Sequence, residues 1–316
     1  MNGIRRQLLQ AIGMTLACAP LRILQAQTAA PEGWRGNFRY IYRNSAYRDE
    51  FKAFLTNVFH LYPEDDFHEL IRRGAEAYET DAEIYSNLQH QLDDIKPALG
   101  DLNYALPALR KQKAVMADQT LALLGSDRRY EGYLEIGSNG RYLDSLEERL
   151  EIVGDRFTVS ERAPAYSLVD ILDRGQLGSA GHYLPLNDYR TDFASAIPRA
   201  SLDLVTVFIG FHHCPIPLRD SFFDGIRQCM KPGGKLIVRD HDVHDGKMWK
   251  VVALAHDVFN LGTQESWGYN ARELRHFYPL AELDAMLTKA GFESGGRRLL
   301  QDGDPTLNSL MMFSKR

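Results

Sequence analysis

The sequence has few cysteines, no excess of basic residues and no long hydrophobic run. Three cysteines, Cys18, Cys214 and Cys229, stand among 316 residues. They are too few for a disulfide framework and lack the paired spacing of zinc motifs. A formal net charge of −5 argues against nucleic-acid binding. We find no repeats and no low-complexity tracts, so the chain reads as an ordinary globular protein held together by packing.

Residues 1–30 resemble a bacterial twin-arginine export signal. Paired Arg5 and Arg6 precede a mildly apolar stretch and the Ala-rich "LQAQTAAP". Arg22 interrupts the apolar stretch, which favours the alternative of an amphipathic N-terminal segment. The stretch is too short to span a bilayer. Export and membrane proximity therefore stay open, and we leave this segment out of the predicted fold.

The rest of the chain divides into a helical part and an alternating part. Residues 34–126 show apolar residues at helical spacing, with Pro63 opening one helix and Gly125 closing the last. In residues 128–316, short apolar runs alternate with amphipathic helices. This alternation predicts an α/β fold, a Rossmann-like doubly wound and mostly parallel sheet. Residues 34–126 would form a helical cap on it.

The predicted sheet has seven strands. They are "GYLEIG", "FTVSE", "HYLPL", "LDLVTVFIGF", "GKLIVRD", "FESGGRRLL" and "NSLMMFSK". The helices expected between them include "RYLDSLEERL", "PAYSLVDILDRG" and "LRDSFFDGIRQCM". Ligands of such sheets bind outside the carboxyl ends of the strands, so we expect the site at these ends.

The first strand ends in a glycine-containing turn, "EIGSNG". Gly137 permits close approach of a ligand to the backbone, and Asn139 belongs to a residue type that tolerates left-handed backbone. Glu135 supplies a negative charge. Glu161 closes the second strand, where an acid typically meets ribose hydroxyls. A dinucleotide oxidoreductase fits less well, because the turn lacks the three-glycine fingerprint and we find no Tyr-x-x-x-Lys pair. A tight turn without any ligand is a further alternative.

Three segments together resemble class I S-adenosylmethionine-dependent methyltransferases. They are "LEIGSNG", "SLDLVTVFIGFHHCP" and "CMKPGGKLIVRDHD", and they occur in the family's order. The likeness covers about residues 132–316 and is nearest to the small-molecule branch that includes the ubiquinone/menaquinone C-methyltransferases. It implies S-adenosylmethionine as cofactor and a small-molecule methyl acceptor.

The resemblance also implies a cofactor site at the strand ends. It places Glu135 and Gly137 under the methionine part and Glu161 at the ribose. Asn187 or Asp188 would lie by the adenine. One departure affects the loop, because the family's second and third glycines fall on Asn139 and Arg141, with Gly140 between them. The cofactor-binding residues assigned in this way are Glu135, Gly137, Asn139, Gly140, Glu161, Asn187, Asp188 and Phe211.

Three histidines are the candidates for acting on the acceptor. Phe211 to His213 would line the floor between cofactor and acceptor, and His241 follows the fifth strand. A histidine near its ordinary pKa suits a general base; for each of His212, His213 and His241, a packing or hydrogen-bonding role is the alternative. The clusters "HHC" and "RDHDVHD" invite a metal, but neighbours in a strand point opposite ways. We therefore expect no metal ion.

The segment "WGYNARELRHF" follows the fifth strand and allows two interpretations. It contributes substrate-selecting residues, or it forms a solvated helix with Asn270 as its N-cap. The residues that could select a substrate are Trp267, Tyr269, Asn270, Arg272 and Arg275.

The sequence thus predicts a class I methyltransferase acting on a small molecule. The alternative is a regulatory protein that keeps the fold and binds the cofactor without turnover. Cofactor supply favours a cytoplasmic location, whereas an export signal would place the protein in the periplasm or at the membrane. The sequence indicates neither the acceptor nor the oligomeric state.

Overall fold

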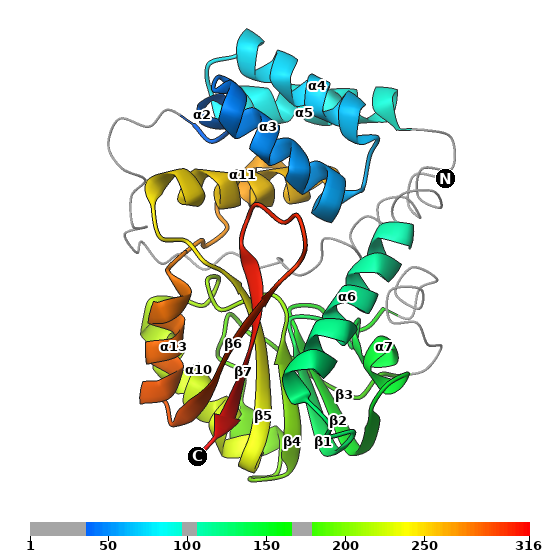
Figure 1. Ribbon diagram of the computed structural model, residues 1–316, viewed down its shortest axis with the longest axis vertical. Helices are drawn as coiled ribbons and strands as arrows, with labels where there is room; N and C mark the ends of the chain where they lie inside the picture. The colour runs from blue at the N-terminus through cyan, green and yellow to red at the C-terminus, as the bar shows by residue number, and fades with distance from the viewer. Residues whose placement is uncertain (1–35, 97–105, 166–178) are drawn as a thin grey trace.

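The structure, a computed structural model, describes residues 36–96, 106–165 and 179–316. Its centre is a seven-stranded sheet in the order β3-β2-β1-β4-β5-β7-β6 (Figure 1). The strands are β1 (Arg129–Ile136), β2 (Glu151–Ser160), β3 (His182–Pro185), β4 (Leu202–Val207), β5 (Met230–His241), β6 (Phe292–Leu300) and β7 (Asn308–Lys315). β7 runs antiparallel to both neighbours, and the other pairs are parallel. This confirms the predicted mostly parallel, doubly wound sheet.

Helices cover both faces of the sheet. α10 (Ile216–Cys229) and α13 (Leu280–Lys289) share one apolar core with the sheet, together with the short α9 (Phe193–Ala196). α6 (Leu106–Leu124) and α7 (Leu143–Glu147) share the core on the other face. β4 contributes to both cores, as expected of a central strand with a continuous apolar run. The sheet is therefore the middle of three layers.

A helical cap lies over the carboxyl ends of the parallel strands (Figure 1). It contains α2 (Phe38–Tyr42), α3 (Ser45–Phe54), the π-helical turn η1 (Leu55–Phe59), α4 (Glu64–Ala77) and α5 (Asp81–Ile95). Pro63 precedes α4, whose first turn carries three acids, as predicted. Thr80 and Glu83 form a capping box that fixes the start of α5.

One helix of the cap comes from the later part of the chain. α11 (Gly246–Gly262) follows β5 and shares the apolar core of the cap helices. α12 (Trp267–Asn270) comes next. α6 belongs to the helical first part of the sequence but packs on the sheet, whereas α11 belongs to the alternating second part but packs with the cap. The sheet layers and the cap therefore each contain helices from both parts of the chain. The division between residues 126 and 128 stays a prediction.

Two predictions fall outside the described residues. They are the export signal in residues 1–30 and most of the helix "PAYSLVDILDRG". Among the helices that the structure does describe, none combines the length and apolar character needed to cross a membrane.

Candidate active site

The predicted site residues lie along the edge of the sheet that faces the cap. Ile136, at the end of β1, pairs with Val159 of β2 and Val207 of β4. β5 ends at His241, beyond its pairing with Val207. The turns that follow these strands therefore meet at one edge, as the sheet type predicts.

Two glycines shape the turn after β1. Gly137 has φ 101° and Gly140 has φ 88°, a region that only glycine adopts readily. A Cβ atom on Gly137 would lie 2.5 Å from Cδ1 of Ile209, and one on Gly140 would meet Cβ of Ala180. Asn139 is not among the residues with positive φ. The left-handed positions thus belong to the glycines, and Asn139 acts through its side chain.

Glu135 holds this turn in shape from within. Its carboxylate is buried and accepts hydrogen bonds from the Tyr133 hydroxyl (2.9 Å), the Ser138 hydroxyl and the Tyr142 N–H (3.3 Å). Burial raises the pKa of Glu135. Because its hydrogen bonds go to the turn and its strand, Glu135 positions the backbone that would face a cofactor.

The end of β2 carries an acid with an unsatisfied oxygen. Asn139 ties the two turns together: it accepts from the Ser160 hydroxyl (2.5 Å) and donates to the Arg162 carbonyl (3.1 Å). Glu161 Oε1 is buried and has no hydrogen-bond partner among the described residues. Burial and the nearby charge of Asp188 raise the pKa of Glu161 to about 7. An oxygen in this state suits a ligand that brings hydroxyl donors.

The turn after β3 has an unusual backbone. Asn187, Asp188 and Tyr189 have φ of 51°, 51° and 64°, which non-glycine residues seldom adopt in succession. Tyr189 is buried and packs edge-on against Phe222, with ring centroids 5.2 Å apart. This packing anchors the turn, while Asp188 is half-buried near Glu161 and Asn187 is exposed.

A pocket of about 80 Å³ lies at the ends of β4 and β5, below the cap. Its lining combines imidazoles with apolar rings from the cap and from α11. The principal lining residues are His212, His213, His241, His256, Phe54, Phe208, Ile209 and Phe259. The three histidines predicted to be catalytic are thus brought together, in a setting that mixes polar and apolar contacts as ligand pockets do.

His212 is fixed by a buried carboxylate. Its Nδ1 donates to Oδ1 of Asp240 at 2.5 Å, and Oδ2 of Asp240 accepts from the Phe211 N–H (2.8 Å) and the Tyr278 hydroxyl (2.6 Å). Burial opposes ionisation of Asp240, but His212 and these hydrogen bonds outweigh it and hold the pKa of Asp240 below its usual value. In the tautomer that donates from Nδ1, the lone pair of the ring lies on Nε2.

His213 and His241 are fixed in the same tautomer by backbone carbonyls. His213 Nδ1 donates to the Leu274 carbonyl (2.7 Å), and His241 Nδ1 donates to the Thr306 carbonyl (3.0 Å). Burial lowers the pKa of His241 to about 3 and that of His213 well below its usual value. Both rings are therefore neutral near pH 7, with the lone pair on Nε2. Their lowered pKa values depart from the near-ordinary pKa that we expected of a general base from the sequence.

Phe211 lies apart from the other predicted site residues. Its side chain is fully buried, and its ring packs edge-on against Phe223 with centroids 4.8 Å apart. It belongs to the core between the sheet and α10, and its N–H, rather than its ring, serves the site through Asp240. The turn after β4 points Phe211 into this core and the two histidines into the pocket.

Sequence reasoning missed the contribution of α11. His256 lines the pocket, and the neighbouring Asp257 is buried. Its carboxylate accepts from Asn270 Nδ2 (2.7 Å) and from Arg275 Nη1 (2.7 Å), while Arg275 Nε donates to Glu273 (2.8 Å). The signal was the polar pair His256–Asp257 within the otherwise apolar "VVALAHDVFNLG".

The same network argues against one of the two interpretations of residues 267–277, while a role in substrate selection stays a prediction because none of Trp267, Tyr269, Asn270, Arg272 and Arg275 lines the pocket. Ser266, not Asn270, caps α12, and Asn270 is its last residue and is buried. The segment is therefore no solvated helix. Asn270 and Arg275 support α11 through these hydrogen bonds to Asp257, whereas Arg272 is exposed.

Ile209 joins the glycine turn to the histidine pocket. Its side chain lies against the α-carbon of Gly137 on one side and lines the pocket on the other. Tyr142, which follows the glycine turn, also lines the pocket and packs on Phe208 with ring centroids 4.5 Å apart. The two predicted parts of the site are thus adjacent.

Comparison with known proteins gives the family. Residues 108–294 match a family model described as a methyltransferase domain, which covers more than half of the chain. The chain belongs to this family and is a class I S-adenosylmethionine-dependent methyltransferase. No curated protein matches it.

Several solved structures are similar in fold at low sequence identity. One is the 1,6-didemethyltoxoflavin-N1-methyltransferase of Burkholderia thailandensis, with bound S-adenosylhomocysteine (14% identity, 73% of this chain and 87% of that chain, TM-score 0.41). Another is a possible exported protein from Bordetella parapertussis (15% identity, 88% and 95%, TM-score 0.46). A third is the N-methyltransferase NodS from Bradyrhizobium japonicum WM9 (15% identity, 66% and 96%, TM-score 0.39).

The residues at the strand ends fit the cofactor of this family, S-adenosylmethionine. The two left-handed glycines let the side chains of Ile209 and Ala180 pack directly on the backbone after β1, which fixes the shape of the turn that would face a ligand. The unsatisfied oxygen of Glu161 can accept from ribose hydroxyls. The assignment of individual residues to parts of the cofactor stays a prediction.

Proposed function

We propose that this methyltransferase acts on a small molecule held in the histidine-lined pocket. The position of Ile209, which contacts the glycine turn and the pocket alike, is the observation that carries the proposal. It places the pocket beside the cofactor turn. The pocket's limited volume and its lining by cap residues Phe54 and Val58 favour a small acceptor.

The chain's part in the reaction is positioning and proton acceptance. S-adenosylmethionine, when bound, supplies an electrophilic methyl group. Apolar rings in the pocket hold the acceptor and exclude water, which converts a bimolecular encounter into a contact. His213 Nε2 is neutral, buried and without a hydrogen-bond partner among the described residues. It is our first choice for accepting a proton from the acceptor, with His212 and His241 as the other predicted residues.

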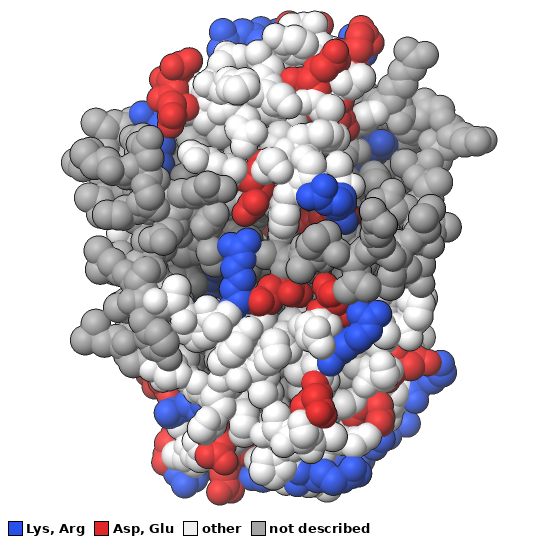
Figure 2. Space-filling view, turned by 180° about the vertical axis from the view of Figure 1, so that it is seen from behind, with Lys and Arg blue, Asp and Glu red and all other residues white. Residues whose placement is uncertain are grey.

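The charge distribution on the described surface does not favour nucleic acid as the acceptor. Lys and Arg side chains alternate with Asp and Glu on the described part of the face in Figure 2, so no basic stripe for nucleic acid is visible there. Because the nearest family branch includes quinone methyltransferases, a quinone-like acceptor is one small molecule to test.

The location of the protein stays a prediction. Cofactor supply favours the cytoplasm, whereas an export signal in residues 1–30 would place the protein in the periplasm or at the membrane.

A metabolite screen with the purified protein tests the proposal. Incubation with S-adenosylmethionine should give S-adenosylhomocysteine and a methylated small molecule. With that acceptor, His213→Asn and His241→Asn should lower turnover more than cofactor affinity, by about 10²–10⁴-fold for a general base. His90→Asn, an exposed histidine on α5, is the matched control.

Two results would argue against the proposal. Cofactor binding without product from any small molecule would favour the regulatory alternative. Wild-type turnover in both His213→Asn and His241→Asn would remove the histidines from catalysis and leave proximity alone. A pH–rate profile separates a base from a contact, because only a base gives a limb that disappears in the variant.

A further inference from the structure

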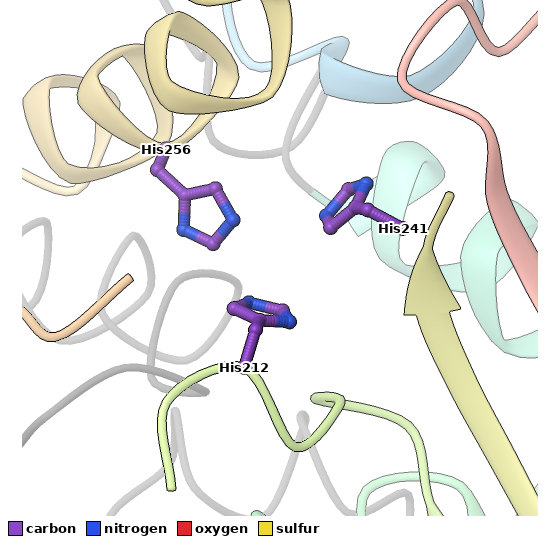
Figure 3. A group of neighbouring side chains, drawn as sticks. All are labelled: His212, His241 and His256. Atoms are coloured by element: carbon purple, nitrogen blue, oxygen red, sulfur yellow. The ribbon is translucent and has the colours of Figure 1, made fainter. Parts of the chain in front are cut away.

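Three histidine rings from three separate elements meet inside the pocket. His212 comes from the turn after β4, His241 from the end of β5 and His256 from α11 (Figure 3). One ring nitrogen from each lies within 4.8 Å of the others. All three side chains are buried, with exposed fractions of 3%, 7% and 6%. The three elements follow in this order along the chain, and the fold turns one ring from each toward the same point.

The nitrogens that face each other lack adequate partners. His212 Nε2 and both ring nitrogens of His256 have no hydrogen-bond partner among the described residues. His241 Nε2 has one long contact, 3.3 Å to the Asn308 amide. Buried polar atoms are normally satisfied. The three imidazoles direct unsatisfied nitrogens toward one centre. This arrangement therefore suits a bound group at that centre.

The Nδ1 hydrogen bonds of His212 and His241 are of the kind that metal-binding histidines make. His212 donates from Nδ1 to the Asp240 carboxylate, and His241 donates from Nδ1 to the Thr306 carbonyl. Such contacts fix the tautomer and orient the ring in metal sites.

We propose that His212, His241 and His256 bind a divalent transition-metal ion such as Zn²⁺ inside the pocket. Since the three nitrogens lie within 4.8 Å of one another, one point lies within about 2.8 Å of all of them. Shifts of about 0.7 Å per ring would reach the ~2.1 Å of a zinc–imidazole bond. Three protein ligands leave a fourth position open, as in catalytic zinc sites.

A second grouping, His213, His256 and Glu273, has less to offer a metal. The Glu273 Oε2 atom already accepts from Arg275 Nε (2.8 Å) and Asn260 Nδ2 (3.3 Å). A metal there would compete with a buried guanidinium for the carboxylate. The three-histidine site has no such competitor, apart from the long Asn308 contact.

The sequence-based expectation of no metal ion considered only neighbours along β5. The premise that neighbouring side chains point in different directions holds. Asp240 hydrogen-bonds His212, His241 lines the pocket, and the Asp242 carboxylate accepts from the Leu280 N–H (2.8 Å). The ligands come instead from the turn after β4, the end of β5 and the interior of α11. If the proposed function is correct, an acceptor oxygen or sulfur could occupy the open position and lose its proton more easily. The metal site itself does not depend on that role.

Metal titration of the chelator-treated full chain tests the site. One equivalent of Co²⁺ should give the visible d–d bands of a low-coordinate site, and Zn²⁺ should abolish them. His256→Gln and His212→Gln should lower the affinity by more than about 100-fold, since even residues behind the ligands contribute 10–100-fold. His90→Gln should bind as the wild type does, and Asp240→Asn should weaken binding about 10–100-fold.

One measurement that can refute the metal site uses only the wild-type protein. X-ray absorption at the zinc edge of the wild type should show imidazole scattering; its absence, or no binding at micromolar metal, would refute the site. Unchanged affinity in folded His256→Gln and His212→Gln would do the same. Isothermal titration of metal-free protein with S-adenosylhomocysteine reports separately on the cofactor site, so failure of one claim is distinguishable from failure of the other.

Discussion

The two halves of the active site are built in different ways. The cofactor half comes from the turns after β1, β2 and β3, and hydrogen bonds within and between the first two turns hold their shape. The histidine pocket collects residues from the turn after β4, from β5, from α11, from the cap and from residues 306–308, and leaves several buried imidazole nitrogens unsatisfied. The strand-end histidines could be recognised in the sequence, whereas the contributions of α11 and of the cap could not.

The difference also concerns what holds each half in place. The glycine turn is shaped by Glu135 and by its own backbone. The pocket depends on a buried ion network behind α11, in which Arg275 bridges Asp257 and Glu273. Each unsatisfied buried group costs about 1–3 kcal/mol, so the pocket needs this rigid support. The comparison predicts that substitutions in the two halves will have different effects on stability and on cofactor affinity.

The largest effect is expected from Arg275→Ala. This change leaves the carboxylates of Asp257 and Glu273 buried without their cation, and should lower the free energy of unfolding by about 3–5 kcal/mol. Denaturant unfolding would measure it. Arg272→Ala, at an exposed arginine three residues earlier, should change stability by less than about 0.5 kcal/mol. Equal effects of the two changes would contradict the network's role.

The next effect concerns the glycine turn. Gly137→Ala puts a Cβ against Ile209, in a backbone region unfavourable for alanine. It should cost about 1–3 kcal/mol of stability and at least about tenfold in affinity for S-adenosylhomocysteine. Gly233→Ala is the matched control, because Gly233 also has positive φ (79°) but open space around it. Calorimetry should find its cofactor affinity unchanged.

Removing the acid at the end of β2 should weaken cofactor binding with little loss of stability. Glu161→Gln replaces an oxygen that can accept ribose hydrogen bonds, at a cost of about 1–3 kcal/mol in binding. Glu148→Gln, at an exposed glutamate, controls for the loss of one charge. Wild-type affinity in a folded Glu161→Gln protein would remove Glu161 from the cofactor site.

The smallest effect is a pH dependence of cofactor affinity. The pKa of Glu161 is raised to about 7 by burial and by Asp188, so the free protein holds this proton up to neutral pH. Its contribution to stability is full below pH 4.5, the ordinary value, and is lost as pH rises through about 7. Hydroxyl donors favour the carboxylate, so affinity should rise about tenfold from pH 6 to pH 8.

Two variants check the origin of that pH dependence. Asp188→Asn removes the neighbouring charge and should move the midpoint to lower pH. Glu161→Gln should abolish this part of the profile. A midpoint that is the same in wild type and Asp188→Asn would show that another group titrates.

The sequence predicted the sheet and the N-terminal helices, because both depend on local patterns, while the location of the cofactor site stays a prediction. The apolar runs predicted all seven strands, and Gly125 follows helix α6 as expected. Phe211 was grouped with His212 and His213 because they adjoin in sequence. The tight turn after β4, in which the Cys214 N–H donates to the Phe211 carbonyl, separates them. His256 was missed because its partners lie in other elements.

A crystal structure of the full chain with S-adenosylhomocysteine tests the central claim most directly. That claim is that the glycine turn and the histidine pocket form one active site, joined at Ile209. We predict that the sulfur atom, from which the methyl group has left, lies beside Ile209 and faces His212, His213 and His241. A ligand bound elsewhere, or a sulfur directed away from the pocket, would contradict the account.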